Sequence, residues 1–396
     1  MSATLAGPPI YKADLFAPEA LRAPFEHYRT LRELGPVVRL AEPSVYVLAR
    51  YSEVRDALRS PDTLISGKGV GFSPQFNNPG GPNLIQSDGD LHARMKTEVL
   101  RPLNVGALKQ HRPLLKQLIA ARVDALIGAG PFDAMVEIAR VLPTQAISFL
   151  VGLPEEGRAR MLDWAAAAFN ALGPPDEKLA SDVDLLVEAF GYVRSQSRDT
   201  VREGSWAHAL FDAVGAGRLS EAEARGAMSA YVVPSLDTTI LAKGHLLYLL
   251  ARNPDQWKVV REDPALISGA VQESLRHSSV IRWFSRVAAK DYASADVFIP
   301  EGERVMLIYP SANRDERRFD DPDRFDIRRD ARAQLAFGNG THMCGGQHLA
   351  RMEMEVMLEA LVERGVEIEA GDPEIGANRG LYGFASLPFE LKRARH

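Results

Sequence analysis

The stretch 335-LAFGNGTHMCGGQHLARME-353 contains the only cysteine of the 396-residue chain, Cys344. Glycines lie on both sides of it, and a histidine lies two positions before it. Glycines let the backbone turn tightly and come close to a bulky group. The helical run that begins near Gly346 directs its N-terminal amides toward the sulfur, which favours the thiolate. These features indicate a chemical role for Cys344, although a lone cysteine is more commonly a small buried hydrophobic residue.

Two other roles for this cysteine fit the residues less well. A cysteine protease needs a histidine base close in space, and no nucleophile-elbow pattern accompanies the nearby His342. A structural zinc site needs pairs of ligands at set spacings, whereas the chain offers one cysteine and nine scattered histidines.

The composition places limits on the class of protein. The chain is 46% hydrophobic and 25% charged, an ordinary globular balance. Its net charge of −5 and pI near 6.0 argue against nucleic-acid binding. One cysteine cannot form an internal disulfide, the N-terminus lacks a signal-peptide pattern, and no apolar run is long enough to span a membrane. We therefore expect a cytoplasmic protein that binds neither nucleic acid nor membrane.

Helical periodicity dominates the chain, and strand patterns gather near its two ends. The sequence predicts a mainly α protein with small β-sheets, with strands at about 36–50, 280–310 and 380–392. Helices are expected at about 92–276 and 345–364. Residues 66–90 are predicted to form a long functional loop. Residues 221–252 read as one helix of roughly 48 Å, disturbed in the middle by Pro234.

The pattern Phe337-Gly338-x-Gly340-x-His342-x-Cys344-x-Gly346-x-x-Leu349-Ala350-Arg351 resembles the haem-binding signature of the cytochromes P450 at every characteristic position. The resemblance implies the cytochrome P450 fold as a single domain over residues 1–396, with a long central helix over haem b. It implies that Cys344 is the axial thiolate ligand of the iron. Phe337 would pack beside the sulfur, Gly338 and Gly346 would let the loop approach the porphyrin, and His342 would lie near a propionate.

Three further cations match family positions at the haem edge. The resemblance implies that His92 and Arg286 meet the haem propionates. Many relatives carry an arginine four residues after this histidine, where the chain has Lys96. Lysine is a point charge rather than a planar fork, so we expect a looser contact there.

Glu273 and Arg276 lie three residues apart and therefore on one helix face. The family completes this Glu-x-x-Arg pair with an arginine from a later loop, and Arg324 matches that position. We interpret the three residues as a structural brace for the cysteine loop.

Asp237 and Thr238 match the acid–alcohol pair of the family's long helix. Reduction of O₂ on iron requires protons, and a carboxyl and a hydroxyl at a helix break can relay them. The family usually has Ala-Gly just upstream, where this chain has Pro234 and Ser235. The pair favours an O₂-dependent monooxygenase over a peroxygenase or a haem-binding sensor.

The resemblance also maps a largely apolar substrate pocket. Its candidate residues are Lys68, Val70, Phe72, Ser73, Phe169, Leu172, Val233, Pro234, Ile281, Arg282 and Phe384. Arg282 either faces the substrate or turns outward to solvent. Segments 67–73 and 169–175 resemble a branch that oxidises para-substituted benzoates, so hydroxylation or O-demethylation of a small aromatic acid is expected. A tailoring oxidase of natural-product biosynthesis is the alternative.

Electrons are expected to come from an iron–sulfur ferredoxin with its reductase. Residues 91–116 contain six cations and the single acid Glu98, and such a basic patch suits an acidic partner. The alternative is an ordinary solvated helix face. The cations are Arg94, Lys96, Arg101, Lys109, Arg112 and Lys116.

Overall fold

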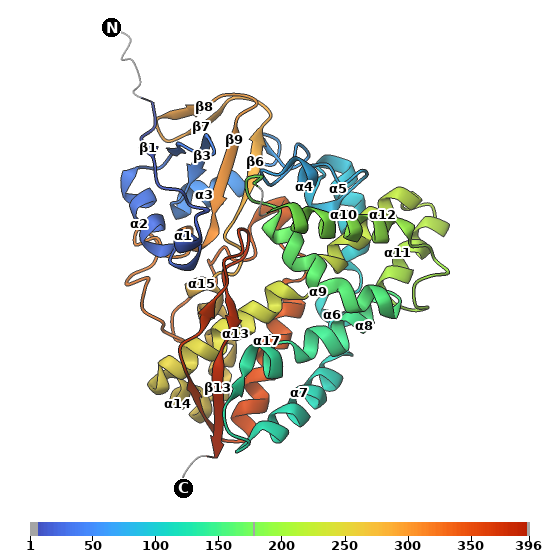
Figure 1. Ribbon diagram of the computed structural model, residues 1–396, viewed down its shortest axis with the longest axis vertical. Coiled ribbons are helices and arrows are strands. Elements are labelled where there is room, and N and C mark those ends of the chain that lie inside the picture. The colour runs from blue at the N-terminus through green and yellow to red at the C-terminus, as the bar shows by residue number, and fades with distance from the viewer. Residues whose placement is uncertain (1–6, 177–178, 394–396) are drawn as a thin grey trace.

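The computed structural model describes residues 7–176 and 179–393. Figure 1 shows a sheet at one end of the molecule, helices through most of the rest, and the strand β13 among the helices toward the C-terminus. The prediction of a mainly helical fold with small sheets is confirmed. No helix in the described ranges is both long and apolar enough to cross a membrane.

The largest sheet has six strands in the order β1-β2-β3-β9-β6-β4. Its strands are β1 (Ile10–Tyr11), β2 (Val38–Leu40), β3 (Val45–Leu48), β4 (Leu64–Ile65), β6 (Trp283–Ala288) and β9 (Arg304–Ile308). The antiparallel register of β6 and β9 pairs Arg286 with Val305 and Val287 with Arg304. Two arginines, one on each strand, therefore lie close together in this sheet.

The smaller sheets lie further along the chain. One joins β10 (Val366–Ala370), β13 (Pro388–Arg393) and β5 (Phe132–Asp133), so a short strand interrupts the region that was predicted to be helical. Two hairpins complete the set, and they pair β7 (Tyr292–Ser294) with β8 (Val297–Ile299) and β11 (Glu374–Ile375) with β12 (Phe384–Ser386).

Helices make up most of the remaining chain. The first half contains α1 (Pro18–Arg22), α2 (Phe25–Leu34), α3 (Tyr51–Leu58), α4 (Pro74–Asn77), η1 (Leu84–Gln86), α5 (Gly89–Leu100), α6 (Val105–Lys109), α7 (Arg112–Leu126), η2 (Met135–Ala139), η3 (Pro143–Ile147), α8 (Ser148–Val151), α9 (Glu155–Asn170) and α10 (Ala180–Ser195). The second half contains α11 (Trp206–Gly215), α12 (Glu221–Val232), α13 (Asp237–Arg252), α14 (Pro254–Glu262), η5 (Pro264–Leu266), α15 (Ile267–His277), α16 (Tyr309–Ala312), η6 (Gly340–His342) and α17 (Gln347–Glu363).

The predicted long helix over 221–252 is two helices. A capping box between Ser220 and Glu223 begins α12, and α13 begins at Asp237. The four residues between them include Pro234, which has no N–H to donate to the preceding turn. An acidic residue in the first turn suits the positive end of the new helix dipole. The break therefore places Asp237 at a helix N-terminus rather than in the middle of a helix.

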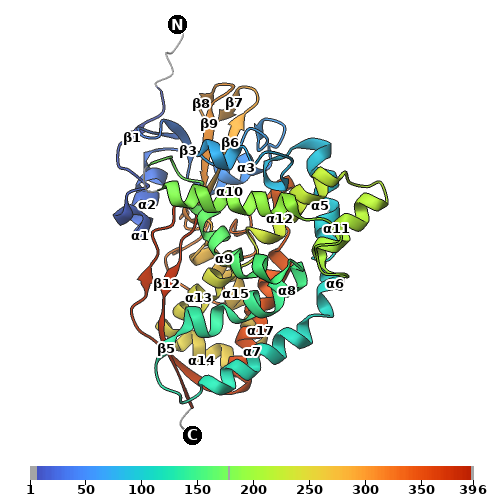
Figure 2. The ribbon, with the colours of Figure 1, turned by 45° about the vertical axis from the view of Figure 1, so that its right-hand side comes forward.

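The helix α13 packs against α15 and α17 at the centre of the molecule (Figures 1 and 2). Nearly every residue from Thr239 to Leu250 is buried, so polar side chains in this span must find partners inside the protein. The helix α17 begins three residues after Cys344. The contact between α13 and α17 therefore brings the helix that carries Asp237 against the helix that follows the cysteine.

The loop over 66–90 is tied to the elements around it. The amide of Ser285 in β6 donates to Val70 O at 2.8 Å, and the amide of Phe72 donates to Leu172 O at 2.7 Å. The side chain of Asn77 both accepts from and donates to the backbone of Gly71. These bonds hold the loop in one position against β6 and the end of α9.

Candidate haem site

The cysteine loop is a tight turn closed by its own backbone. Cys344 N donates to Phe337 O at 2.8 Å, and Gly338 and Gly340 both have φ of +70°. A side chain on Gly340 would lie 2.5 Å from the backbone oxygen of Leu58, so only glycine fits at that position. The backbone requirement of the turn explains two of the glycines.

The Cys344 thiol has accessible surface, yet the protein packed around it raises its pKa. The two facts agree if the side chain lines an interior recess rather than the outer surface. The amides of Gly346 and Gln347 act in the opposite direction, as do the cations Arg351 and Lys96. These four groups would stabilise a thiolate, which is the form that ligates a metal.

Two histidines from distant parts of the chain lie together beside this loop. The rings of His92 and His342 are 4.2 Å apart between centroids. Burial lowers the pKa of both histidines, and that of His92 falls to about 4. The charge of Lys96 acts in the same direction on both, and His342 further lowers the pKa of His92. His342 Nε2 is buried without a hydrogen-bond partner among the described residues, although Asp88 Oδ1 lies 3.5 Å away. His342 Nε2 is therefore available to form a hydrogen bond with a bound group.

Asp88 is a residue of the site that sequence reasoning missed. Its carboxylate accepts from the amides of Ser66 at 3.0 Å and Gly67 at 2.7 Å, and it faces His342. Asp88 thereby connects the 66–73 loop, the start of α5 and the cysteine loop. Asp88 lies in the predicted loop over 66–90, where no pattern in the sequence indicates its partners, and its side chain does not cap α5.

Lys96 and Arg286 also reach the region of the cysteine loop. Lys96 Nζ donates to Thr341 O and, at 3.3 Å, to Met343 O. Arg286 is buried, donates to Ser285 O at 2.8 Å, and lowers the pKa of His342 by its charge. Lys96 thus braces the loop, and the predicted contacts of both cations with propionates remain predictions.

These residues fit a haem. On one wall of the inferred recess lies the Cys344 thiol, whose pKa is raised by burial while the neighbouring amides and cations act toward the thiolate. At its edge lie the orphaned nitrogen of His342 and the buried guanidinium of Arg286, which suit carboxylates. Gly338 and Gly346 carry no side chain where the loop faces the recess, and a Cβ on Gly346 would approach the Cys344 sulfur to 3.9 Å.

Asp237 and Thr238 lie at the break between α12 and α13. Burial raises the pKa of Asp237 from 3.8 to about 7, and the nearby Asp163 acts in the same direction while Arg140 opposes it. Thr238 Oγ1 donates to Pro234 O at 2.8 Å, which anchors the hydroxyl at the helix break. A carboxyl that titrates near pH 7 can both accept and release a proton at physiological pH.

The predicted Glu273–Arg276 pair forms, but its third member is Arg329 rather than Arg324. Arg276 and Glu273 are fully buried and make two hydrogen bonds of 2.7 and 2.8 Å. Arg329 Nε lies 3.2 Å from Glu273 Oε1. The Arg324 side chain is 62% exposed, and its one ion pair within the described residues is with Asp326 at 3.7 Å, while its backbone oxygen accepts from Arg276. The prediction for Arg324 is wrong because the loop turns that side chain outward.

Arg282 takes neither of its two predicted orientations. Its side chain is buried, with Nε donating to Asn378 O and Leu381 O and Nη2 donating to Leu21 O at 2.5 Å. Its guanidinium also lies 5.2 Å from the ring centre of Tyr382. Arg282 therefore holds three backbone segments together through two of its nitrogens, and its buried Nη1 has no hydrogen-bond partner among the described residues.

The other predicted pocket residues divide by accessibility. Phe72, Val233, Pro234 and Ile281 are accessible, and Lys68 is exposed. Phe169 and Phe384 are nearly buried, with Phe384 packed on His245 and Tyr248. Val70, Ser73 and Leu172 expose no surface, and the Ser73 hydroxyl accepts from Phe76 N as the cap of α4. These three residues therefore have no surface with which to contact a substrate.

Arg304 is a second residue that the sequence did not indicate. Its guanidinium donates to Gly69 O at 2.9 Å, Lys68 O at 3.2 Å and Ser285 Oγ at 2.8 Å. Arg304 thus fixes the backbone of Lys68 to the large sheet. Only its place opposite Val287 in the strand pairing brings it there, and that pairing is not visible in the sequence.

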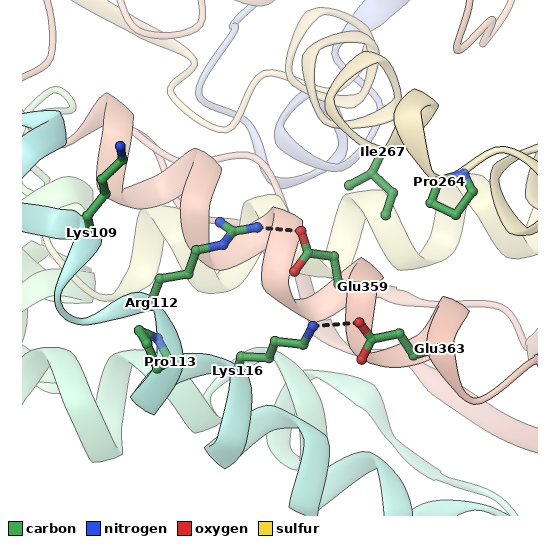
Figure 3. Close-up of a pocket in the computed structure, with 8 residues that line it drawn as sticks. All are labelled: Lys109, Arg112, Pro113, Lys116, Pro264, Ile267, Glu359 and Glu363. Carbon is green, nitrogen blue, oxygen red and sulfur yellow. Dashed lines mark hydrogen bonds and ion pairs between the residues drawn. The ribbon is translucent and has the colours of Figure 1, made fainter.

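The predicted basic patch over 91–116 is largely neutralised by Glu98 of the same segment and by acids from other helices. Arg94 pairs with Glu223 at 2.7 Å, Arg101 pairs with Glu98 at 2.6 Å, and Arg112 and Lys116 pair with glutamates of α17. Figure 3 shows the last two pairs in a groove between α7 and α17, where Lys109 extends without a drawn partner. Among the described residues, Lys109 alone of the six cations has neither an ion pair nor a hydrogen bond.

Comparison with known proteins gives the same answer as the site. The family model described as Cytochrome P450 matches residues 183–374. Cytochrome p450 CYP199A2 of Rhodopseudomonas palustris is 35% identical over 395 residues, covering 98% of this chain and 96% of that protein. The beta-dihydromenaquinone-9 omega-hydroxylase of Mycobacterium tuberculosis is 33% identical, covering 94% of this chain and 77% of the relative. The solved structure of P450BioI with a ligated acyl carrier protein has a TM-score of 0.85 at 25% identity, covering 94% and 100% of the two chains.

The chain belongs to the cytochrome P450 family. It is a monooxygenase, an oxidoreductase that uses O₂, and its cofactor is haem b. Bacterial members of the family take the electrons for this reaction from a ferredoxin and its reductase.

Proposed function

We propose that this monooxygenase hydroxylates or O-demethylates a small aromatic acid, with Cys344 as the haem ligand. Haem bound through a cysteine thiolate supplies the activation of O₂. His92, His342 and Arg286 bind its carboxylates, and Lys96 stiffens the loop that presents the sulfur. Asp237 and Thr238 hold and pass the protons that the reaction consumes, with the carboxyl able to reload near pH 7.

The tethered loop over 66–73 is the observation that carries the substrate proposal. Phe72 packs on Trp283 at 4.8 Å and on Phe16 at 5.8 Å, which makes a rigid aromatic surface suited to a flat ring. Arg304 anchors the backbone of Lys68 four residues earlier. A fixed aromatic wall with a lysine in the same tethered loop suits a ring that carries one carboxylate, and this segment resembles the branch that oxidises para-substituted benzoates.

Positioning explains the site of oxidation in this proposal. A carboxylate held by Lys68 at one end of the ring presents the opposite substituent to the oxidant. Since Arg282 and Ser73 are engaged elsewhere, Lys68 is the remaining member of the predicted anionic anchor. The test therefore concentrates on this lysine.

The test is substrate-induced conversion of the haem to the high-spin form, followed by absorption. Para-substituted benzoates are compared with the matching benzamides, which have the same shape without the charge. We expect the acids to bind at least about tenfold more tightly, and Lys68→Met to remove most of that difference while retaining the aliphatic stem. Lys109→Met serves as the matched control because this lysine is exposed on a different surface. Equal affinity for acids and amides would refute the anionic anchor.

The alternative is a larger substrate, as in a tailoring oxidase. A long-chain prenyl quinone is included in the panel because one relative is named for such a substrate. A high-spin shift with the quinone and none with any benzoate would replace the aromatic-acid proposal. Product formation with peroxide and no reductant would instead favour a peroxygenase.

A further inference from the structure

An ion pair lies in the core between the two helices that flank the haem site. Lys243 of α13 donates to Glu353 Oε2 of α17 at 2.9 Å, and both side chains are completely buried. Within the described residues, Glu353 Oε1 has no hydrogen-bond partner. None of the roles proposed above uses this pair.

The pair is a costly way to fill the core. Burial lowers the pKa of Lys243 and raises that of Glu353, so burial disfavours the charged form of each residue. The opposite charge of the partner acts against this effect in both cases. Replacing a buried ion pair with apolar residues is often neutral or stabilising, so stability alone does not explain one. The best-attested use of a buried polar contact is to fix how two helices are aligned along each other. Apolar side chains permit small sliding movements, whereas a single directional hydrogen bond does not.

The positions of the two residues show which groups that alignment affects. Lys243 lies six residues after Asp237, about 9 Å along α13 at 1.5 Å per residue. Glu353 lies six residues after Gln347, again about 9 Å along α17 from the end that follows Cys344. The pair therefore joins the two helices at similar distances from their ends at the haem site.

We propose that the Lys243–Glu353 ion pair is a positioning device that fixes the register of α13 against α17. It thereby holds Asp237 and Thr238 at a set place relative to the haem bound by Cys344. This inference rests on the proton-delivery role proposed above and is independent of the substrate. A register shift would displace the proton donors, and a larger share of the O₂ consumed would then be released as hydrogen peroxide. In that release two electrons and two protons reduce O₂ to H₂O₂, with the electrons supplied by NADH through the reductase and ferredoxin.

The test measures hydrogen peroxide released per NADH consumed by the haem-loaded full chain with a ferredoxin and its reductase. In K243M/E353L, we expect this fraction to rise at least about threefold, because small misplacements of reacting groups have large effects on rate. The spectrum of the reduced, CO-bound protein should not change, since the cysteine ligand is untouched. E353Q retains an acceptor for Lys243 and should stay near the wild-type fraction. D124N/R364M removes an ion pair between α7 and the C-terminal end of α17 and should have no effect.

An unchanged peroxide fraction in K243M/E353L, with an intact CO spectrum, would overturn the inference. If that variant takes up no haem, K243M/E353Q replaces it, and a peroxide fraction equal to that of E353Q would overturn the inference as well. Asp237→Asn separates the two proposals. If Asp237→Asn leaves the peroxide fraction unchanged, the proton-delivery role fails. If the peroxide fraction rises in Asp237→Asn but not in K243M/E353L, only the register role is refuted.

Discussion

Replacing Arg329 tests whether it, rather than Arg324, completes the buried Glu273–Arg276 brace. Arg329 is 15% exposed and donates to Glu273 at 3.2 Å, to Asp320 O at 2.6 Å and to Asp321 O at 3.0 Å. Hydrogen bonds from a charged donor contribute about 1.5–3 kcal/mol each. The two carbonyls can rehydrate at the loop surface, so we count mainly the contact with the buried carboxylate. Arg329→Ala should therefore lower the free energy of unfolding by about 3 kcal/mol.

Arg324 gives a contrasting expectation five residues earlier in the same loop. Its side chain is 62% exposed and makes one long ion pair, so Arg324→Ala should change stability by no more than about 0.5 kcal/mol. Urea unfolding of the two holo variants, followed by tryptophan fluorescence and haem absorption, measures both values. A loss in Arg324→Ala that equals or exceeds the loss in Arg329→Ala would refute the reassignment. Because domains are stable by only about 5–15 kcal/mol, Arg329→Ala should also yield less haem-loaded protein.

Three further changes probe other parts of the site. Since the Asp237 pKa is about 7, turnover with O₂ should fall as pH rises through 7. The folded state also binds this proton more tightly than the unfolded chain does, so the free energy of unfolding should decrease as pH rises from about 4 to 7. Asp237→Asn should flatten both pH profiles, which steady-state assays and thermal melts measure. Lys96→Met removes the donor to two loop carbonyls and should speed haem transfer to apomyoglobin, whereas Arg94→Met, on the same helix, should not. Lys109→Ala should slow reduction by ferredoxin severalfold at low salt, and Lys116→Ala, whose ammonium is already paired, should have a smaller effect in stopped-flow measurements.

The cysteine loop could be predicted from the sequence because its requirements are local. Positive φ at Gly338 and Gly340, the bond from Cys344 to Phe337 and the helix that follows all lie within a short segment. The fold class followed from helical periodicity for the same reason. The break before Asp237 was visible through Pro234, but periodicity does not show that the helix ends there and begins again.

Long-range polar contacts could not be predicted from the sequence. Arg324 and Arg329 occupy an irregular loop, where no repeat indicates which side chain turns inward. The acids that neutralise Arg112 and Lys116 lie more than 240 residues further along the chain, so the basic run appeared unpaired. Lys243 stands among apolar residues of α13, and nothing in its neighbourhood indicates Glu353, 110 residues away.

Three arginines share a physical role that explains why the prediction for Arg282 failed. Arg276, Arg282 and Arg304 each donate mainly to backbone carbonyls of segments outside regular helices and strands. Buried carbonyls without a ladder or helix partner need another donor, and a guanidinium offers five N–H groups in a rigid plane. These arginines therefore fix loops in place. Among the predicted substrate-pocket residues, Lys68 is the cation whose charge is free to act on a ligand. It follows that selectivity for an acid, if the enzyme has it, should depend on Lys68 far more than on any buried arginine.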